Sequence, residues 1–177
     1  MNIENQLLVV HSKTNNLLIC NWIGSDKKRF AELMRIFLGK EYVLVQRSAW
    51  SVSELGIKNP PLIQPYLDTM IDAVEKPLHP AVQRNVLKLL AETDIKLTED
   101  QEGKLLMIAF DLLADPNVPV AIRVHAMQFI ANLCKTYPDL AIELKALIED
   151  GMENGSAGFR SRGARILKKL EAGFINN

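Results

Sequence analysis

Apolar residues recur along the chain at intervals of three and four, the spacing of an amphipathic helix, and strand-like alternation is nearly absent. The one β-prone run, Tyr42 to Val45, is short and continues directly into helix-forming sequence. Glycine and proline interrupt the pattern regularly, with Ser25 or Asp26 suited to begin a helix and Gly39 suited to end one. The pattern predicts an all-α protein of about ten helices, each of roughly 9 to 17 residues.

Four arginines mark an internal repeat, because Arg47, Arg84, Arg123 and Arg162 follow one another at intervals of 37, 39 and 39 residues. The positions ten and fourteen residues before each arginine are all apolar, and three of the four positions seven residues before it hold proline or glycine. The two apolar positions lie one turn apart on a first helix, and the arginine opens a second helix. Each repeat is therefore predicted to be a helical hairpin that buries its apolar face by stacking on its neighbours.

The strings His79-Pro-Ala-Val-Gln-Arg84 and Asp115-Pro-Asn-Val-Pro-Val-Ala-Ile-Arg123-Val-His-Ala126 carry a resemblance to a known family. They resemble HEAT repeats, in which a loop and an arginine precede a small residue, here Ala126. The segments SDKKRFAEL, QRSAW and SAGFRSR are also similar to a group of small bacterial HEAT-like proteins.

The resemblance implies a right-handed α-solenoid of about four HEAT-like helical hairpins, in a single domain. Within residues 1–177, the N-terminal capping helix or helices are expected in 1–24 and the repeats in 26–56, 60–95, 98–135 and 139–172. The first and fourth repeats depart from the HEAT pattern, since Trp50 and Arg165 stand where the small residue is usual.

Composition and charge are those of an ordinary folded domain. The 177 residues include 21 basic and 21 acidic side chains, and 48% are apolar. This balance excludes a histone-like nucleic-acid binder, an acidic tail and a disordered chain.

We find neither a signal peptide nor an apolar stretch of the roughly 18 residues that span a membrane, so a cytoplasmic protein is expected. Cys20 and Cys134 lie far apart in apolar helical patterns, which favours buried reduced thiols.

The repeated arginine of HEAT units usually pairs with acidic or carbonyl groups of its own or a neighbouring turn. The resemblance therefore implies a structural role for Arg47, Arg84 and Arg123. Candidate acidic partners are Glu41, Glu75 and Asp115. A ladder of anion-binding arginines is the alternative.

The second helices of HEAT repeats line the concave side of the stack, and here they carry polar residues at spacings of three and four, which share one helix face. A solvated helix face has the same pattern. The functional interpretation is a groove that binds a protein or peptide, and the residues expected to contact this partner are Ser51, Asn85, Lys88, Glu92, His125, Gln128, Asn132, Arg165 and Lys168.

The glycine-rich turn from Gly151 to Gly158 leads into a helix with five basic residues. Backbone amides at a helix start, together with Ser156, Arg160 and Arg162, form a candidate anion-binding site. The alternative is a basic helix that only keeps the end of a solenoid soluble. The string Gly-Ser-Ala-Gly-Phe within this turn resembles the mobile loop of the fumarase/aspartase superfamily, but the rest of that signature is absent, so lyase activity is not expected.

Catalytic and metal-binding patterns are not found in the sequence. His11, His79 and His125 have no partner at ligand spacing, and neither GxSxG nor GxGxxG occurs. The sequence thus favours a non-enzymatic HEAT-like adaptor for a protein or peptide, with no cofactor, metal or membrane. The second hypothesis is binding of a nucleic-acid backbone through the basic C-terminal repeat, by analogy with HEAT-like DNA glycosylases.

Overall fold

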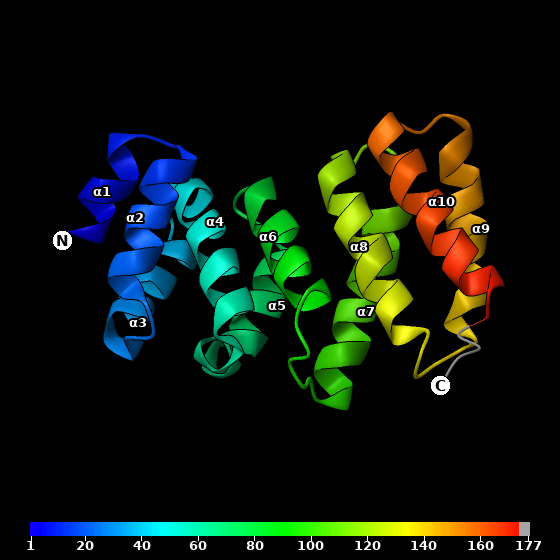
Figure 1. The fold of residues 1–177 in the computed structure, drawn as a ribbon, viewed down its shortest axis with the longest axis horizontal. Coiled ribbons are helices and arrows are strands. Elements are labelled where there is room, and N and C mark those ends of the chain that lie inside the picture. Colours follow the sequence, from blue (N-terminus) through cyan, green and yellow to red (C-terminus); the bar gives the residue numbers. More distant parts are fainter. Residues whose placement is uncertain (174–177) are drawn as a thin grey trace. The chain divides into compact units, whose positions relative to one another are not determined.

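The structure is a computed structural model that describes residues 1–173, and within this range it consists of helices and connecting turns without a strand (Figure 1). The all-α prediction is confirmed. The helices of residues 1–101 are α1 (Ile3–Val9), α2 (Lys13–Ile23), α3 (Lys27–Phe37), α4 (Tyr42–Lys58), α5 (Leu67–Glu75) and α6 (Pro80–Ala91), with short 3₁₀ turns η1 (Pro60–Leu62) and η2 (Gln64–Tyr66). The remaining helices are α7 (Glu99–Ala114), α8 (Val120–Leu133), α9 (Leu140–Glu153) and α10 (Ala157–Glu171).

The chain divides into two compact units, which we call unit 1 (Met1–Gln101) and unit 2 (from Glu102 onward). The expectation of a single domain stays a prediction. Each expected repeat range holds one helix pair, namely α3 with α4, α5 with α6, α7 with α8 and α9 with α10, and α4 runs two residues beyond the expected limit at residue 56. The region 1–24 holds α1 and α2.

Local sequence explains where several helices begin. The Asp26 carboxylate accepts hydrogen bonds from the backbone N–H groups of Arg29 and Lys28, which lower its pKa and cap α3. Thr98 and Gln101 bond reciprocally through side chain and backbone at the start of α7, the arrangement of a capping box. Pro80 occupies the first position of α6, where its missing N–H costs no hydrogen bond. The expected start near Asp26 is confirmed.

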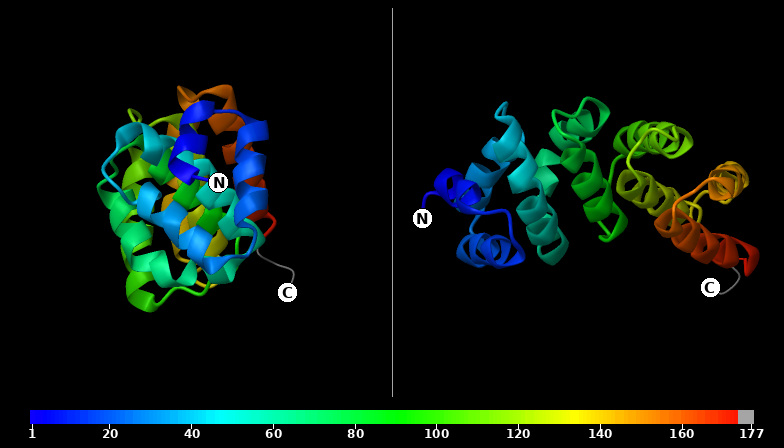
Figure 2. Two further views of the ribbon diagram at one scale, coloured as in Figure 1. Left: turned by 90° about the vertical axis from the view of Figure 1, so that its left-hand side faces the viewer. Right: turned by 90° about the horizontal axis from the view of Figure 1, so that it is seen from above.

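The core of unit 1 is built around α4, which contacts α1, α2, α3 and α6 (Figures 1 and 2). Its buried positions include Val45, Ala49 and Val52, spaced by three and four. The β-prone run at Tyr42 forms the first turn of this helix, because burial of the helical stripe that follows outweighs local strand propensity.

Unit 2 is centred on α8, which contacts both α9 and α10. Its core is made by side chains of all four helices, among them Leu113, Ile130, Ile148 and Phe159. Each of these side chains is buried. Apolar burial of this kind is the main stabilising contribution in a helical repeat unit.

Both cysteines are buried and free, as the sequence predicts. Burial raises the pKa of the Cys20 thiol to about 11 and also raises that of Cys134. Among the helices of residues 1–173, none is long and apolar enough to cross a membrane.

Candidate binding site

In unit 2, α8 and α10 present two rows of polar side chains side by side. The α8 row is His125, Gln128 and Asn132, and the α10 row is Arg162, Arg165 and Lys169. Both rows have the spacing i, i+3, i+7, which places their members on one side of each helix. We call these six residues the unit 2 face.

A chain of hydrogen bonds joins the two rows. Arg162 donates from Nη1 to Oε1 of Gln128 at 2.8 Å, and Gln128 donates from Nε2 to Oδ1 of Asn132 at 2.9 Å. Within residues 1–173, the buried Nε of Arg162 has no hydrogen-bond acceptor. The bond between Arg162 and Gln128 fixes which side of α10 is turned toward α8.

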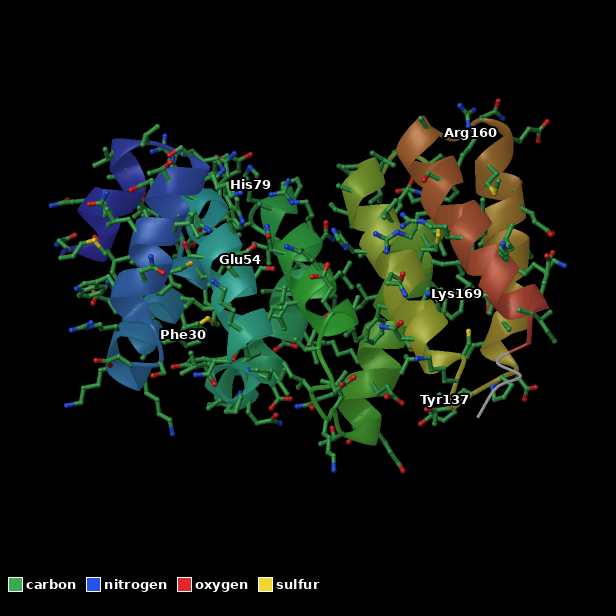
Figure 3. The ribbon with its side chains drawn as sticks, in the orientation of Figure 1. Phe30, Glu54, His79, Tyr137, Arg160 and Lys169 are labelled. Carbon is green, nitrogen blue, oxygen red and sulfur yellow. The ribbon has the colours of Figure 1, made fainter. Side chains whose placement is uncertain are left out.

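The charge on α10 is strongly positive, because the helix carries five basic residues and a single acidic one, Glu171. Arg160 lies near its N-terminal end and Lys169 near the opposite end (Figure 3). Arg165, Lys168 and Lys169 are exposed, and no acidic side chain within residues 1–173 forms an ion pair with them. The positive charge is therefore left to solvent or to a partner.

The corresponding surface of unit 1 satisfies its own charges. Lys88 on α6 forms an ion pair with Glu54 on α4, with 3.6 Å between Nζ and Oε1. The indole of Trp50 donates to the same carboxylate oxygen at 3.3 Å. Glu92 is exposed at the end of α6. Lys88 thus already has an acidic partner, whereas among residues 1–173 Arg165, Lys168 and Lys169 have none.

Two of the residues predicted to contact a partner are buried in the core of unit 1, so the prediction is wrong for them. Ser51 donates from Oγ to Oδ1 of Asn16 at 2.7 Å, and Asn85 donates from Nδ2 to the carbonyl of Ala81 at 2.8 Å. The physical reason for Ser51 is that α2 packs against α4 and covers the side that carries this residue. The polar Asn16, directly before the apolar run 17–20 of α2, is the only sequence signal of this contact.

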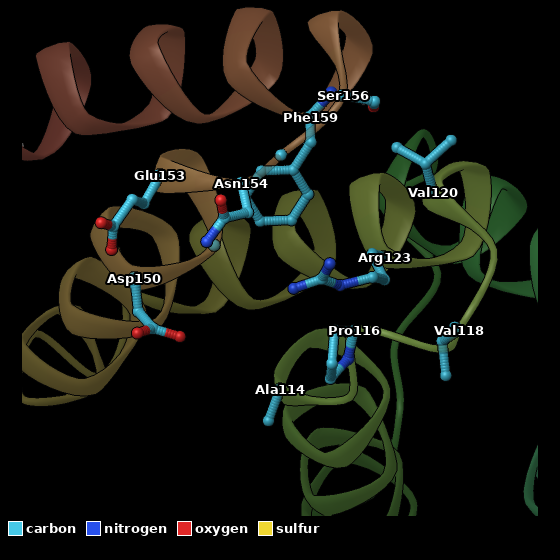
Figure 4. Close-up of a pocket in the computed structure, with 12 residues that line it drawn as sticks. Ala114, Pro116, Val118, Val120, Arg123, Asp150, Glu153, Asn154, Ser156 and Phe159 are labelled. Atoms are coloured by element: carbon cyan, nitrogen blue, oxygen red, sulfur yellow. Dashed lines mark hydrogen bonds between the residues drawn. The ribbon is translucent and has the colours of Figure 1, made fainter.

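A cleft of about 410 Å³ opens in unit 2 between the turn that joins α7 to α8 and the turn that joins α9 to α10. Figure 4 shows the Arg123 guanidinium reaching into it below the ring of Phe159, with Asp150 nearby (Figure 4). Arg123 donates from Nε to the carbonyl of Leu113 at 3.0 Å, and its guanidinium lies 4.5 Å from the centre of the Phe159 ring. Burial lowers the pKa of Arg123, and the negative charges of Asp115 and Asp150 oppose this shift.

The three residues predicted to bind an anion do not meet at one point. The Oγ of Ser156, at the edge of the cleft, accepts the backbone N–H of Phe159 at 3.3 Å and so caps α10. Arg162 is turned toward Gln128 of α8, and Arg160 is exposed on α10 without lining the cleft. The reason is the helical geometry, since residues 160 and 162 project about 160° apart around the axis. The structure therefore does not bring these three side chains together, and anion binding by them stays a prediction.

A family model of the HEAT repeat domain matches residues 3–170. This chain is a HEAT-repeat protein. No curated protein and no solved structure gives a significant match. The HEAT repeat domain is a scaffold fold of the protein-interaction type, and its members are typically not enzymes. Across residues 1–173, we find no group of three or more histidine, cysteine, aspartate or glutamate side chains placed to hold a metal ion.

The HEAT arginines differ in what they contact. Arg47 donates from Nη1 to the carbonyls of Leu7 and Leu8, at 2.9 Å each, and so joins α4 to the last turn of α1. Arg123 bonds to a carbonyl of its own repeat, as described above. Arg84 is exposed on α6, because residues 81, 82, 85 and 86 form the buried side of that helix. Carbonyl pairing, one of the two expected modes, thus occurs for Arg47 and Arg123, and Arg84 is not held in this way.

We expect the Arg47→Met variant to lower the free energy of unfolding by about 2 kcal/mol, because charge-assisted bonds to two carbonyls are lost. Methionine keeps much of the aliphatic stem, so the change isolates the guanidinium. The measurement is the denaturation midpoint followed by tryptophan fluorescence, since Trp22 and Trp50 both lie in unit 1. The exposed Arg84→Met variant is the control, and an equal loss in both would show that the carbonyl bonds contribute nothing.

Proposed function

We propose that this HEAT-repeat protein is a non-enzymatic adaptor that binds a protein or peptide along its second helices, principally at the unit 2 face. The observation that carries the proposal is the presence there of exposed cations without ion-pair partners within the described part of the chain, next to a hydrogen-bonded row of amides on α8. Polar side chains held in place by one another lose little freedom when a ligand binds, which favours recognition. The residues proposed to contact the partner are His125, Gln128, Asn132, Arg165, Lys168 and Lys169.

Binding to nucleic acid is less well supported by this arrangement. A duplex carries one charge about every 1.7 Å of its axis and needs a groove with positive charge along its length. In unit 2, α8 has a single basic residue, Arg123, which is engaged with Leu113. The positive charge of the unit 2 face therefore comes from α10 alone.

The proposal is tested by site-specific photo-cross-linking in lysate of the cells that produce the protein. A photoreactive phenylalanine derivative replaces Lys168 beside the unit 2 face, and in a matched variant it replaces Ile142, which is 78% exposed on α9. We expect the Lys168 probe to give protein adducts that the Ile142 probe does not give. These adducts should disappear when Arg165→Glu and Lys169→Glu are added.

Identical adducts from both probes would contradict the proposal, because binding would then not be located at this face. Adducts that nuclease treatment removes would replace the proposal with nucleic-acid binding. Both probe variants must show the same denaturation midpoint, so that exposure of core residues does not cause the cross-links.

A further inference from the structure

The α10 row is a continuous stripe of positive charge along one side of the helix. From Arg162 through Arg165 to Lys169 there are seven helical steps, which correspond to about 10 Å at a rise of 1.5 Å per residue. The bond from Arg162 to Gln128 turns this side toward α8. The stripe therefore borders the α8 row along its length.

No acidic residue of α10 neutralises the positive charge of this stripe. Glu171 is the only acidic residue of α10, and helical geometry places it about 160° around the axis from Lys169. Elsewhere the chain pairs neighbouring charges, as on α9, where Lys145 and Glu149 lie 3.7 Å apart one turn from each other. The α10 stripe thus lacks the intrahelical partner that α9 provides for its lysine.

The α8 row adds hydrogen-bonding groups without negative charge. Residues 120–133 contain no aspartate or glutamate, and the row consists of two amides and an imidazole that already have interaction partners. By contrast, α9 carries Glu143, Glu149, Asp150 and Glu153. An anionic ligand is therefore attracted to the side where α8 and α10 meet and repelled from the side of α9.

We infer that the unit 2 face binds an acidic peptide segment, whose carboxylates pair with Arg165 and Lys169 beside the uncharged α8 row. The inference rests on the proposed function and names the chemical class of its partner. A stripe of about 10 Å matches two turns of a helical peptide or three to four residues of an extended one. Its short length favours such a segment over a nucleic-acid duplex, which would continue past α10 onto uncharged or acidic surface.

The test uses the full chain and fluorescent peptides of about twelve residues, rich in alanine, with glutamates at i, i+3 and i+7. The first control peptide has glutamine in place of each glutamate, and single-stranded and duplex DNA of similar length are the other probes. Fluorescence anisotropy gives the affinities. We expect the glutamate peptide to bind at least about tenfold more tightly than the glutamine peptide, and its affinity to fall as salt is raised.

Charge reversal then locates the site. Arg165→Glu combined with Lys169→Glu should weaken binding of the glutamate peptide by at least about tenfold. The matched control combines Lys27→Glu with Lys28→Glu, which changes the net charge equally at exposed positions of α3 in unit 1. This control variant should bind the glutamate peptide within about twofold of the unchanged protein, because a change of net charge outside the unit 2 face has only a weak long-range effect. Equal denaturation midpoints show that both variants are folded.

Three results would overturn the inference. Equal binding of glutamate and glutamine peptides would show that carboxylates are not recognised, and equal loss in both charge-reversed variants would place recognition away from α10. Tighter binding of DNA than of the glutamate peptide, with the same dependence on Arg165 and Lys169, would assign the face to nucleic acid. If cross-linking at Lys168 still yields protein adducts in the first of these cases, the adaptor function stands and only the acidic partner is wrong.

Discussion

Replacing Phe159 by alanine is expected to lower the free energy of unfolding of unit 2 by about 3–5 kcal/mol, the range for removing a buried phenylalanine ring. The Phe159 side chain is 1% exposed, and its ring packs against Gly151 and over the Arg123 guanidinium. Its removal leaves a cavity and also deprives the half-buried guanidinium of its aromatic contact. Far-UV circular dichroism during denaturation measures the change, because neither tryptophan lies in unit 2.

The control for this prediction is Arg160→Ala, which changes the next residue of α10 at an exposed position. We expect it to alter stability by no more than about 0.5 kcal/mol. A loss below about 1 kcal/mol in Phe159→Ala would mean that unit 2 collapses around the missing ring, or that the ring is not part of its core. Because the unit 2 face is not touched by this change, peptide binding below the unfolding transition should be retained.

The architecture could be predicted from the sequence because HEAT hairpins are specified locally. The arginine repeat, the apolar positions before it and breakers such as Pro80 each act within a few residues, and the helix pairs lie where these signals place them. Capping also depends on near neighbours, as Thr98 and Gln101 show. Features that depend on residues close together in the sequence are therefore predictable from the sequence.

The predictions that were wrong concern residues whose burial depends on contacts between helices far apart in the sequence. Whether Ser51 faces a partner depends on α2, whose Asn16 meets it from 35 positions away. Likewise, the repeated arginines look equivalent in sequence, yet Arg47 bonds to α1 while Arg84 is exposed. No local pattern encodes which helix covers which side of another, because the same amphipathic stripe packs at several registers.

The residues of the candidate binding surface could be predicted from the sequence, but which of its charged side chains form ion pairs could not. The basic residues of α10 are visible in the sequence, and so are Lys88 and Glu54. Only the structure shows that Lys88 is paired with Glu54 across two helices while Arg165 and Lys169 lack such a partner in the described residues. This difference, rather than the number of charges, favours unit 2 over unit 1 as the place where a charged partner binds.

Gly155→Ala is expected to destabilise unit 2 by about 3 kcal/mol, because the added methyl group has no space. A Cβ at this position would lie 2.4 Å from the backbone carbonyl oxygen of Gly151, a group fixed in the last turn of α9. Relief requires movement of the backbone that brings Phe159 and the Ser156 cap into place, so both are disturbed together. The glycine-rich turn is thus explained by close approach of the chain to itself.

The matched control lies three residues further along in the same turn. A Cβ at Gly158 would meet nothing nearer than Ser156 Oγ at 3.9 Å, and the residue is in the first turn of α10. Gly158→Ala is therefore expected to stabilise unit 2 by about 0.5–1 kcal/mol through the lower chain entropy of the unfolded state. Denaturation followed by circular dichroism should give opposite signs for the two variants. A neutral or stabilising effect of Gly155→Ala would show that the spacing between Gly151 and Gly155 does not limit the packing of this turn.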